Sequence, residues 1–218
     1  RIGIAPNFLL KSIAAHWPLF IYAIAFMAAL NGMSHGTQDL YATFLQKQHG
    51  FSPGTTSLLA MIGAVGAILG SIGFGMLSQR FGRRAVVMFC TAVGICAIPL
   101  WIFSSTIATL ALGVFIIQIA VQGCWGVIPA HLNELSPADV RGTFPGFTYQ
   151  LGNLIAASIA QVEAVLAAKT PLATGAPNYA VAMAIVAASV LVSGFILAAI
   201  GHLVRKENRG LAFAPSAS

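Results

Sequence analysis

The chain has 218 residues, of which 58% are hydrophobic and only 7% are charged, and its mean hydropathy is +0.86. Soluble domains carry about 25% charged residues, so this composition excludes an ordinary soluble protein and indicates a membrane protein. The net charge of +6 does not indicate a nucleic-acid-binding protein, because the basic residues lie in short clusters between apolar runs, as topology signals do.

Six apolar segments are long enough to cross a bilayer, which takes about 20 helical residues. They cover residues 16–45, 54–78, 85–104, 107–133, 143–167 and 178–204. The loops between them are short. The sequence therefore predicts an all-α polytopic membrane protein, a single bundle of six transmembrane helices within residues 1–218.

The distribution of basic residues predicts the orientation of this bundle. If the N-terminus is cytoplasmic, only Lys47 and Lys169 lie outside. The nine basic residues that then lie inside are Arg1, Lys11, Arg80, Arg83, Arg84, Arg141, Arg205, Lys206 and Arg209. Basic residues collect in short cytoplasmic loops, so we expect a plasma (cell inner) membrane protein with both termini in the cytoplasm.

The first segment contains an unusual group of polar residues. On a helix with about 100° per residue, five of them share one face, namely Asn31, Ser34, His35, Gln38 and Asp39. An Asp at a helix centre costs about 2.5–3.5 kcal/mol on insertion scales, so this face must border protein or a watery cavity rather than lipid. We interpret it as the wall of a transport path. The alternative is a structural His35–Asp39 pair that holds two helices together.

The second and fourth segments carry patterns that favour helix packing. Gly66 and Gly70 form a G-x-x-x-G pair, which permits close helix approach. Gln118 and Gln122, four residues apart, can bind a substrate carboxylate or hydroxyl, or bridge two helices; we favour the bridge. Cys90, Cys96 and Cys124 lie in apolar runs without metal-ligand spacing and are interpreted as core thiols.

Two loops on the predicted cytoplasmic side carry charged residues and glycines at distinctive spacing. Residues 75–84 read G-M-L-S-Q-R-F-G-R-R, and residues 129–142 read P-A-H-L-N-E-L-S-P-A-D-V-R-G. Both resemble loop signatures of the major facilitator superfamily, although Gln79 replaces the usual Asp of the first. By this resemblance, the cytoplasmic gate residues are Arg80, Gly82, Arg83, Arg84, Glu134 and Arg141. Glu134 and Arg141 are expected to form a charge network that holds the inward gate closed.

The fifth segment adds amides that can face a cavity near the membrane midplane. Gln150 and Asn153 lie three residues apart, and Glu163 is expected near the outer end of the helix, where water can hydrate it. The sixth segment is almost entirely aliphatic and is interpreted as support.

The first segment also resembles a narrower family. Its residues fit the N-x-x-[ST]-H-x-[ST]-Q-D-x-x-x-T signature of the sialate:proton symporter family, and are similar to fungal lactate/pyruvate permeases. The matching residues are Asn31, Ser34, His35, Thr37, Gln38, Asp39 and Thr43. The Tyr149–Asn153 stretch is similar to that of the same permeases, in which the Gln at the position of Gln150 belongs to the substrate path. The resemblance implies that the chain is the C-terminal six-helix half of a twelve-helix transporter, a fragment that lacks its N-terminal half.

The resemblance further implies symport of a small carboxylate with a proton by alternating access. A proton is the only coupling species expected, with no cofactor and no metal. The substrate and proton path then comprises Asn31, Ser34, His35, Gln38, Asp39, Thr43, Gln150 and Asn153. A His can take up a proton near neutral pH, and a neighbouring carboxylate favours the charged imidazolium, which attracts the anion. Its partners would be the small carboxylate, the proton, the lipid bilayer and the missing half.

Two other functions remain open at this point. The first is transport of sialic acid instead of a lactate- or pyruvate-type monocarboxylate, and the second is a non-transporting assembly or receptor protein with the same fold. An intramembrane enzyme is not expected, since the sequence has no H-E-x-x-H metal helix and no G-x-S-x-G nucleophile turn.

Overall fold

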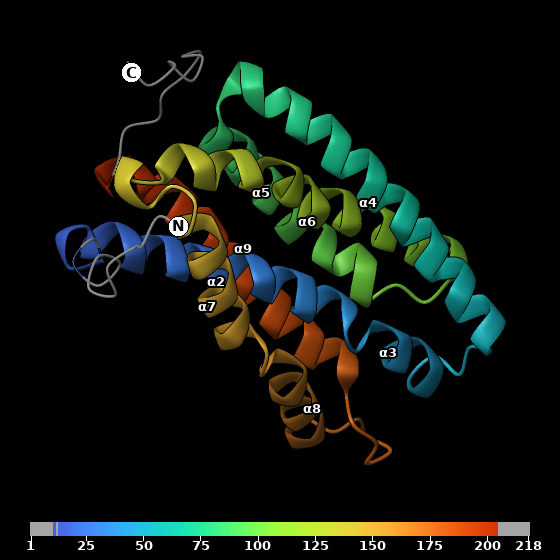
Figure 1. The fold of residues 1–218 in the computed structure, drawn as a ribbon. Coiled ribbons are helices and arrows are strands. Elements are labelled where there is room, and N and C mark those ends of the chain that lie inside the picture. The colour runs from blue at the N-terminus through green and yellow to red at the C-terminus, as the bar shows by residue number, and fades with distance from the viewer. Residues whose placement is uncertain (1–10, 12, 205–218) are drawn as a thin grey trace.

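The computed structural model describes residue 11 and residues 13–204 (Figure 1). The predicted inside charges at Arg1, Arg205, Lys206 and Arg209 lie outside the described residues. Across the described part of the chain the structure is helical, without strands, and six helical spans are long and apolar enough to cross a membrane. The predicted all-α bundle of six spans is therefore confirmed.

The six spans lie close to the expected segments, and two of them are made of two helices each. The helices are α2 (Trp17–Gln38), α3 (Tyr41–Lys47), α4 (Pro53–Phe81), α5 (Arg83–Ile102), α6 (Ile107–Leu135), α7 (Phe144–Ala156), α8 (Ile159–Lys169) and α9 (Tyr179–Val204), with a short 3-10 turn η1 (Ala138–Val140) between α6 and α7.

The helix starts and the tightest connection follow from local residue chemistry. Ser52 and Thr106 cap α4 and α6, since each hydroxyl accepts a hydrogen bond at 3.2 Å from the backbone N–H three residues later. A single residue, Gly82, connects α4 to α5 with φ of 97°. Only glycine adopts that backbone region without strain, which explains the glycine at this position of the loop signature.

The first and fifth spans are interrupted within their length. The first is broken at Asp39 and Leu40, where Leu40 adopts φ of −97° and ψ of 1°, outside the helical region. The fifth is broken at Ala157 and Ser158. Discontinuous helices of this kind occur beside the substrate sites of secondary transporters, because an interrupted backbone at membrane depth must border protein or a cavity.

The packing has an internal symmetry in which the spans fall into two sets of three. The first helix of one set, α2, packs on α7 and α9, which are the second and third spans of the other set. Likewise α6 packs on α4 and α5. Figure 1 shows α4 lying along α6 on one side of the bundle and α7 beside α2 on the other. The two first helices, α2 and α6, contact each other between these layers.

Glycines set the closest helix contact, between α4 and α6. A β-carbon built on Gly66 would lie 2.5 Å from the carbonyl oxygen of Phe115, and one on Gly70 would collide with the Ile119 carbonyl. On the facing helix, a β-carbon on Gly126 would collide with the Ser71 carbonyl. The G-x-x-x-G pair therefore serves helix packing, as predicted.

Replacing Gly70 by Ala should destabilise the bundle by about 1–3 kcal/mol, because the new methyl group meets backbone atoms of α6 that cannot move aside. Gly73→Ala is the matched control: it lies three residues away on α4 and a β-carbon there meets no atom within 4 Å. The free energy of unfolding in detergent micelles measures both. Equal stability of the two variants would contradict the packing role.

Candidate functional site

His35 joins two helices of the bundle through both of its ring nitrogens. Its Nδ1 lies 2.9 Å from Oδ2 of Asp39, the C-cap residue of α2, and its Nε2 lies 3.3 Å from Oδ1 of Asn153 on α7. Both partners offer acceptor oxygens, so a doubly protonated ring satisfies both contacts, whereas a neutral ring has a single N–H. The His35 and Asp39 side chains are 33% and 38% exposed, so the described helices do not enclose the pair.

The other residues of the predicted polar face do not all turn toward His35. The Ser34 hydroxyl accepts a hydrogen bond of 2.6 Å from Nε1 of Trp125 on α6. Asn31 is buried, and its amide donates at 2.9 Å to the Met27 carbonyl of its own helix. The residues of this face thus have different partners: His35 contacts α7, Ser34 contacts α6, and Asn31 bonds to the backbone of α2 itself.

Thr43 follows Asp39 by four residues and Gln150 precedes Asn153 by three, but neither side chain takes part in the contacts of His35. Thr43 is half-buried on α3, and Gln150 is exposed on α7, one turn before Asn153. Neither side chain forms a hydrogen bond to another described residue. Their predicted place in the substrate path stays a prediction.

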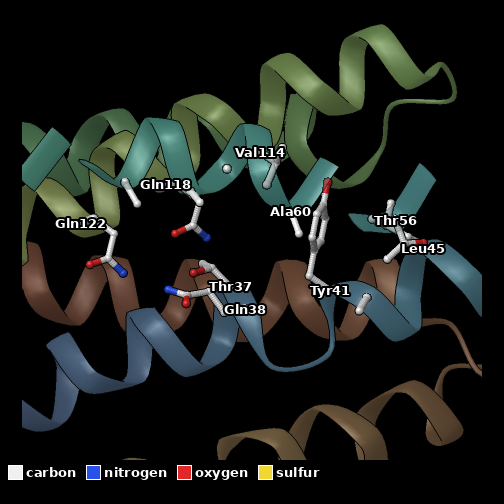
Figure 2. A pocket seen from close by; sticks show the side chains of 13 residues that line it. Thr37, Gln38, Tyr41, Leu45, Thr56, Ala60, Val114, Gln118 and Gln122 are labelled. Atoms are coloured by element: carbon white, nitrogen blue, oxygen red, sulfur yellow. The ribbon is translucent and has the colours of Figure 1, made fainter. Parts of the chain in front are cut away.

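A cavity of about 310 Å³ opens beside this site, between α2/α3, α4 and α6. Figure 2 shows Gln118 and Gln122 projecting from α6 toward Thr37 and Gln38 of α2. The cavity is lined by Thr37, Gln38, Tyr41, Ala42, Leu45, Thr56, Ala60, Gly63, Ala64, Ala67, Val114, Gln118 and Gln122. Its polar groups are amides and hydroxyls, without a charged side chain.

The two glutamines of α6 were expected to bridge helices, and the structure shows otherwise. Among the described residues, no hydrogen bond joins Gln118 or Gln122 to another helix, and both side chains line the cavity. The Tyr41 hydroxyl and the Thr56 hydroxyl, which the sequence analysis missed, are also buried there without a hydrogen-bond partner. Both residues place a hydroxyl group in an otherwise apolar membrane segment, and this feature of the sequence could have identified them. Unpaired polar groups around a cavity are suited to bind a polar solute.

Glu163 was also misplaced by the sequence analysis. It was expected to be hydrated near the outer end of its helix, but its side chain is completely buried, at 0% exposure, on α8. The break between α7 and α8 was not predicted from the sequence, and the part of the span after it, α8, contacts both α2 and α9.

At the opposite end of the bundle, the charge pair differs from the predicted one. Glu134 accepts a hydrogen bond of 3.1 Å from Nε of Arg83 and does not pair with Arg141, which is exposed. The turn at Gly82 directs Arg83 back toward the end of α6, where its Nη1 also donates to the Ser78 hydroxyl at 2.6 Å. Arg84 is buried, and Arg80 is exposed above the Phe81 ring.

Comparison with known proteins places this geometry in context. The profile of the family described as "Sugar (and other) transporter" matches residues 12–206. The chain is 36% identical over 199 residues to the carboxylic acid transporter protein homolog of Saccharomyces cerevisiae. The aligned region covers 88% of this chain and 32% of the yeast protein.

Shorter matches are found to glucose transporters. Human solute carrier family 2, facilitated glucose transporter member 14, is 35% identical over 109 residues, or 49% of this chain and 21% of that protein. Glucose transporter GlcP of Staphylococcus epidermidis is 29% identical over 126 residues, or 56% of this chain and 28% of that protein. The chain thus spans at most about a third of the length of these relatives.

The Arg83–Glu134 pair makes a testable stability prediction. Its side chains are only 16% and 21% exposed, so Arg83→Ala and Glu134→Ala should be coupled by about 0.5–3 kcal/mol in a double-mutant cycle of unfolding. Arg141→Ala, at an exposed position, should show no coupling to Glu134→Ala. Coupling of Glu134 to Arg141 instead of Arg83 would contradict the observed pairing.

Proposed function

Because this chain belongs to the sugar (and other) transporter family, we propose that it forms part of a secondary active transporter that carries a small carboxylate together with a proton. The first choice of substrate is a lactate- or pyruvate-type monocarboxylate. The observation that carries this proposal is the contact of His35 with both Asp39 and Asn153. The carboxylic acid transporter homolog of yeast, which aligns with most of this chain, supports the substrate class.

The His35–Asp39 pair gives a physical basis for coupling a proton to an anion. With a neutral imidazole the pair carries one negative charge, which repels a carboxylate; with an imidazolium the pair is neutral. A proton on His35 therefore favours entry of the anion, and the anion favours the proton to the same extent, since linkage between two bound species is reciprocal. A carboxylate that reaches Nε2 would accept its hydrogen bond in place of Asn153.

The neighbouring cavity supports a small solute. Its volume of about 310 Å³ is at the lower end of ligand pockets, which range over about 300–1,000 Å³. Gln38 belongs to the predicted polar face and also lines the cavity, so the cavity and the face that carries His35 and Asp39 share one residue. Gln118 and Gln122 would donate hydrogen bonds to its carboxylate or hydroxyl oxygens.

Transport would need the second half of the molecule. Transporters of the major facilitator type rock two six-helix halves about a central site, and the six spans here correspond to one such half. We place this half at the C-terminal side of a twelve-helix protein in the plasma (inner) membrane, with the Gly82 turn and the segment after α6 on the cytoplasmic side. The excess of basic residues at that end supports this orientation.

A hydroxyl-rich solute is the second candidate, either sialic acid or a neutral sugar. The uncharged amide and hydroxyl lining of the cavity favours it, as do the matches to glucose transporters. Counterflow of labelled lactate into proteoliposomes distinguishes transport from a non-transporting assembly protein, and an excess of unlabelled glucose or sialic acid tests the substrate class.

Disrupting the His35–Asp39 pair should strongly reduce coupled transport. We expect His35→Ala and Asp39→Asn to reduce lactate uptake driven by a pH gradient about 10- to 100-fold, because a hydrogen bond to a charged group contributes about 1.5–3 kcal/mol. Asn153→Ala should have a smaller effect. His202→Ala, at an exposed position near the end of α9, is the matched control. Undiminished gradient-driven uptake in His35→Ala would refute the proposed role.

The cavity amide separates the two substrate classes. Gln118→Leu removes a neutral hydrogen bond at nearly constant volume, so the apparent affinity for lactate should fall about 2- to 12-fold. The exposed Gln161 provides the control variant Gln161→Leu. If the substrate is a sugar, glucose should compete with lactate for uptake, and Gln118→Leu should reduce uptake more than His35→Ala does. Uptake of labelled lactate and labelled glucose by the two variants distinguishes the two substrate classes.

A further inference from the structure

The carboxyl group of Glu163 is buried in the bundle without a hydrogen-bond partner. Its side chain has 0% exposure, and neither Oε1 nor Oε2 accepts or donates a hydrogen bond within the described part of the chain. An ionised carboxylate in such a place is very costly, because nothing replaces the water it has lost. A buried acid in this position is therefore expected to hold a proton.

The group lies directly against the helix that carries His35 and Asp39. A β-carbon built on Gly36 would lie 3.5 Å from Oε1 of Glu163 and 3.0 Å from Val186 of α9. Gly36 follows His35 in the chain, so the absence of a side chain there lets the carboxyl approach α2 at the level of the His35–Asp39 pair. Ile159 of α8 packs on the same surface of α2.

Few charged groups surround Glu163. On the side of α2 these are His35, which precedes Gly36 in the chain, and Asp39 at the C-cap of the helix. On α8 the nearest other charge is Lys169, at the exposed end of the helix. On α9, residues 179–204 include no Asp, Glu, Lys or Arg, and the ionisable Tyr179 and His202 lie near its two ends. Of α2 and α9, which both pack on α8, the acidic side chain nearest to this contact is therefore Asp39 of the proposed proton site.

Glu163 lies on a short helix that can move, so its carboxyl group can become exposed to water. It lies on α8, a helix of 11 residues bounded by the break at Ala157–Ser158 and by the loop that follows Lys169. A short segment between two interruptions can shift against α2 without unfolding the rest of the bundle.

We propose that Glu163 is a second proton-binding site of the transport cycle. It holds a proton while its carboxyl is packed against Gly36, and it releases that proton when α8 moves and water enters the contact. In the release step the carboxyl O–H bond breaks, the proton passes to water or to the Asp39 carboxylate, and the electron pair stays on Glu163. This inference rests on the proton-coupled transport proposed above.

The coupling to the first site follows from charge. A negative charge nearby disfavours ionisation of a carboxyl group, so Glu163 keeps its proton most firmly while the charge of Asp39 is uncompensated. An imidazolium at His35 compensates Asp39 and eases the release of the Glu163 proton. Protonation of His35 and deprotonation of Glu163 therefore favour each other. The transporter then has two positions between which a proton can be transferred.

The alternative is that Glu163 is a permanently neutral packing residue, and Glu163→Gln separates the two. Glutamine imitates the protonated acid in size and polarity but cannot release a proton. In proteoliposomes that hold the complete protein, Glu163→Gln should keep lactate counterflow within about twofold and lose pH-gradient-driven accumulation about tenfold or more, within the range of about 5- to 150-fold expected for such coupling. Gln161→Ala, on the same helix, is the control.

Two outcomes overturn the proposal. Unchanged gradient-driven accumulation in Glu163→Gln would show that no proton is exchanged there. Loss of counterflow together with accumulation would also refute it, because an isosteric neutral side chain should preserve the exchange of substrate.

A second measurement needs no substrate. Infrared titration of the reconstituted protein should show a protonated-carboxyl band that disappears at alkaline pH and is missing from Glu163→Gln; a band that does not titrate, or that persists in the variant, contradicts the proposal. If the parent protein does not exchange lactate, the proposed carboxylate transport fails, and the infrared titration still decides the state of Glu163.

Discussion

Polar groups inside an apolar bundle must find their partners within the protein, and this requirement determines how the helices of this chain are arranged. The polar face of α2 is the largest concentration of such groups, and the bundle places other helices around it: α7 at His35, α6 at Ser34 and α9 along the remaining side. The aliphatic residues of α4 and α9 remain available for the outer surface of the bundle. The position of α2 between the two layers therefore follows from its own residues.

Close packing and interruption act together around this helix. Glycines bring α4 and α6 into backbone contact on one side of the bundle. On the other side, the first and fifth spans are broken near Asp39 and Ala157, and the polar contacts of His35, Asp39 and Asn153 lie close to these breaks. A closely packed layer facing an interrupted one suits the proposed transport, which needs short segments beside the site to move.

The chemistry of the site depends on how few charges it contains. One imidazole and one carboxylate form a pair on the polar face of α2, Gln38 of that face lines an amide-bearing cavity, and a second carboxyl is buried against Gly36, the residue after His35. With so few charged groups, one proton changes the net charge of the site: the His35–Asp39 pair is negative when the imidazole is neutral and uncharged overall when the imidazole is protonated. This is the physical link between family membership, which indicates transport, and the proposed coupling of a carboxylate to a proton.

The sequence by itself determined the features that depend on composition and short spacing. The six spans, the glycine packing of α4 on α6 and the pairing of His35 with Asp39 four residues later all follow from hydropathy and helical periodicity. The tertiary structure alone decided which distant groups meet. Arg83 and not Arg141 reaches Glu134, Asn153 meets His35, the glutamines of α6 line a cavity, and Glu163 is buried against Gly36. These contacts depend on the Gly82 turn and on the two helix breaks, since a turn or a break redirects every side chain that follows it. Periodicity along one helix contains no information about which face another helix covers.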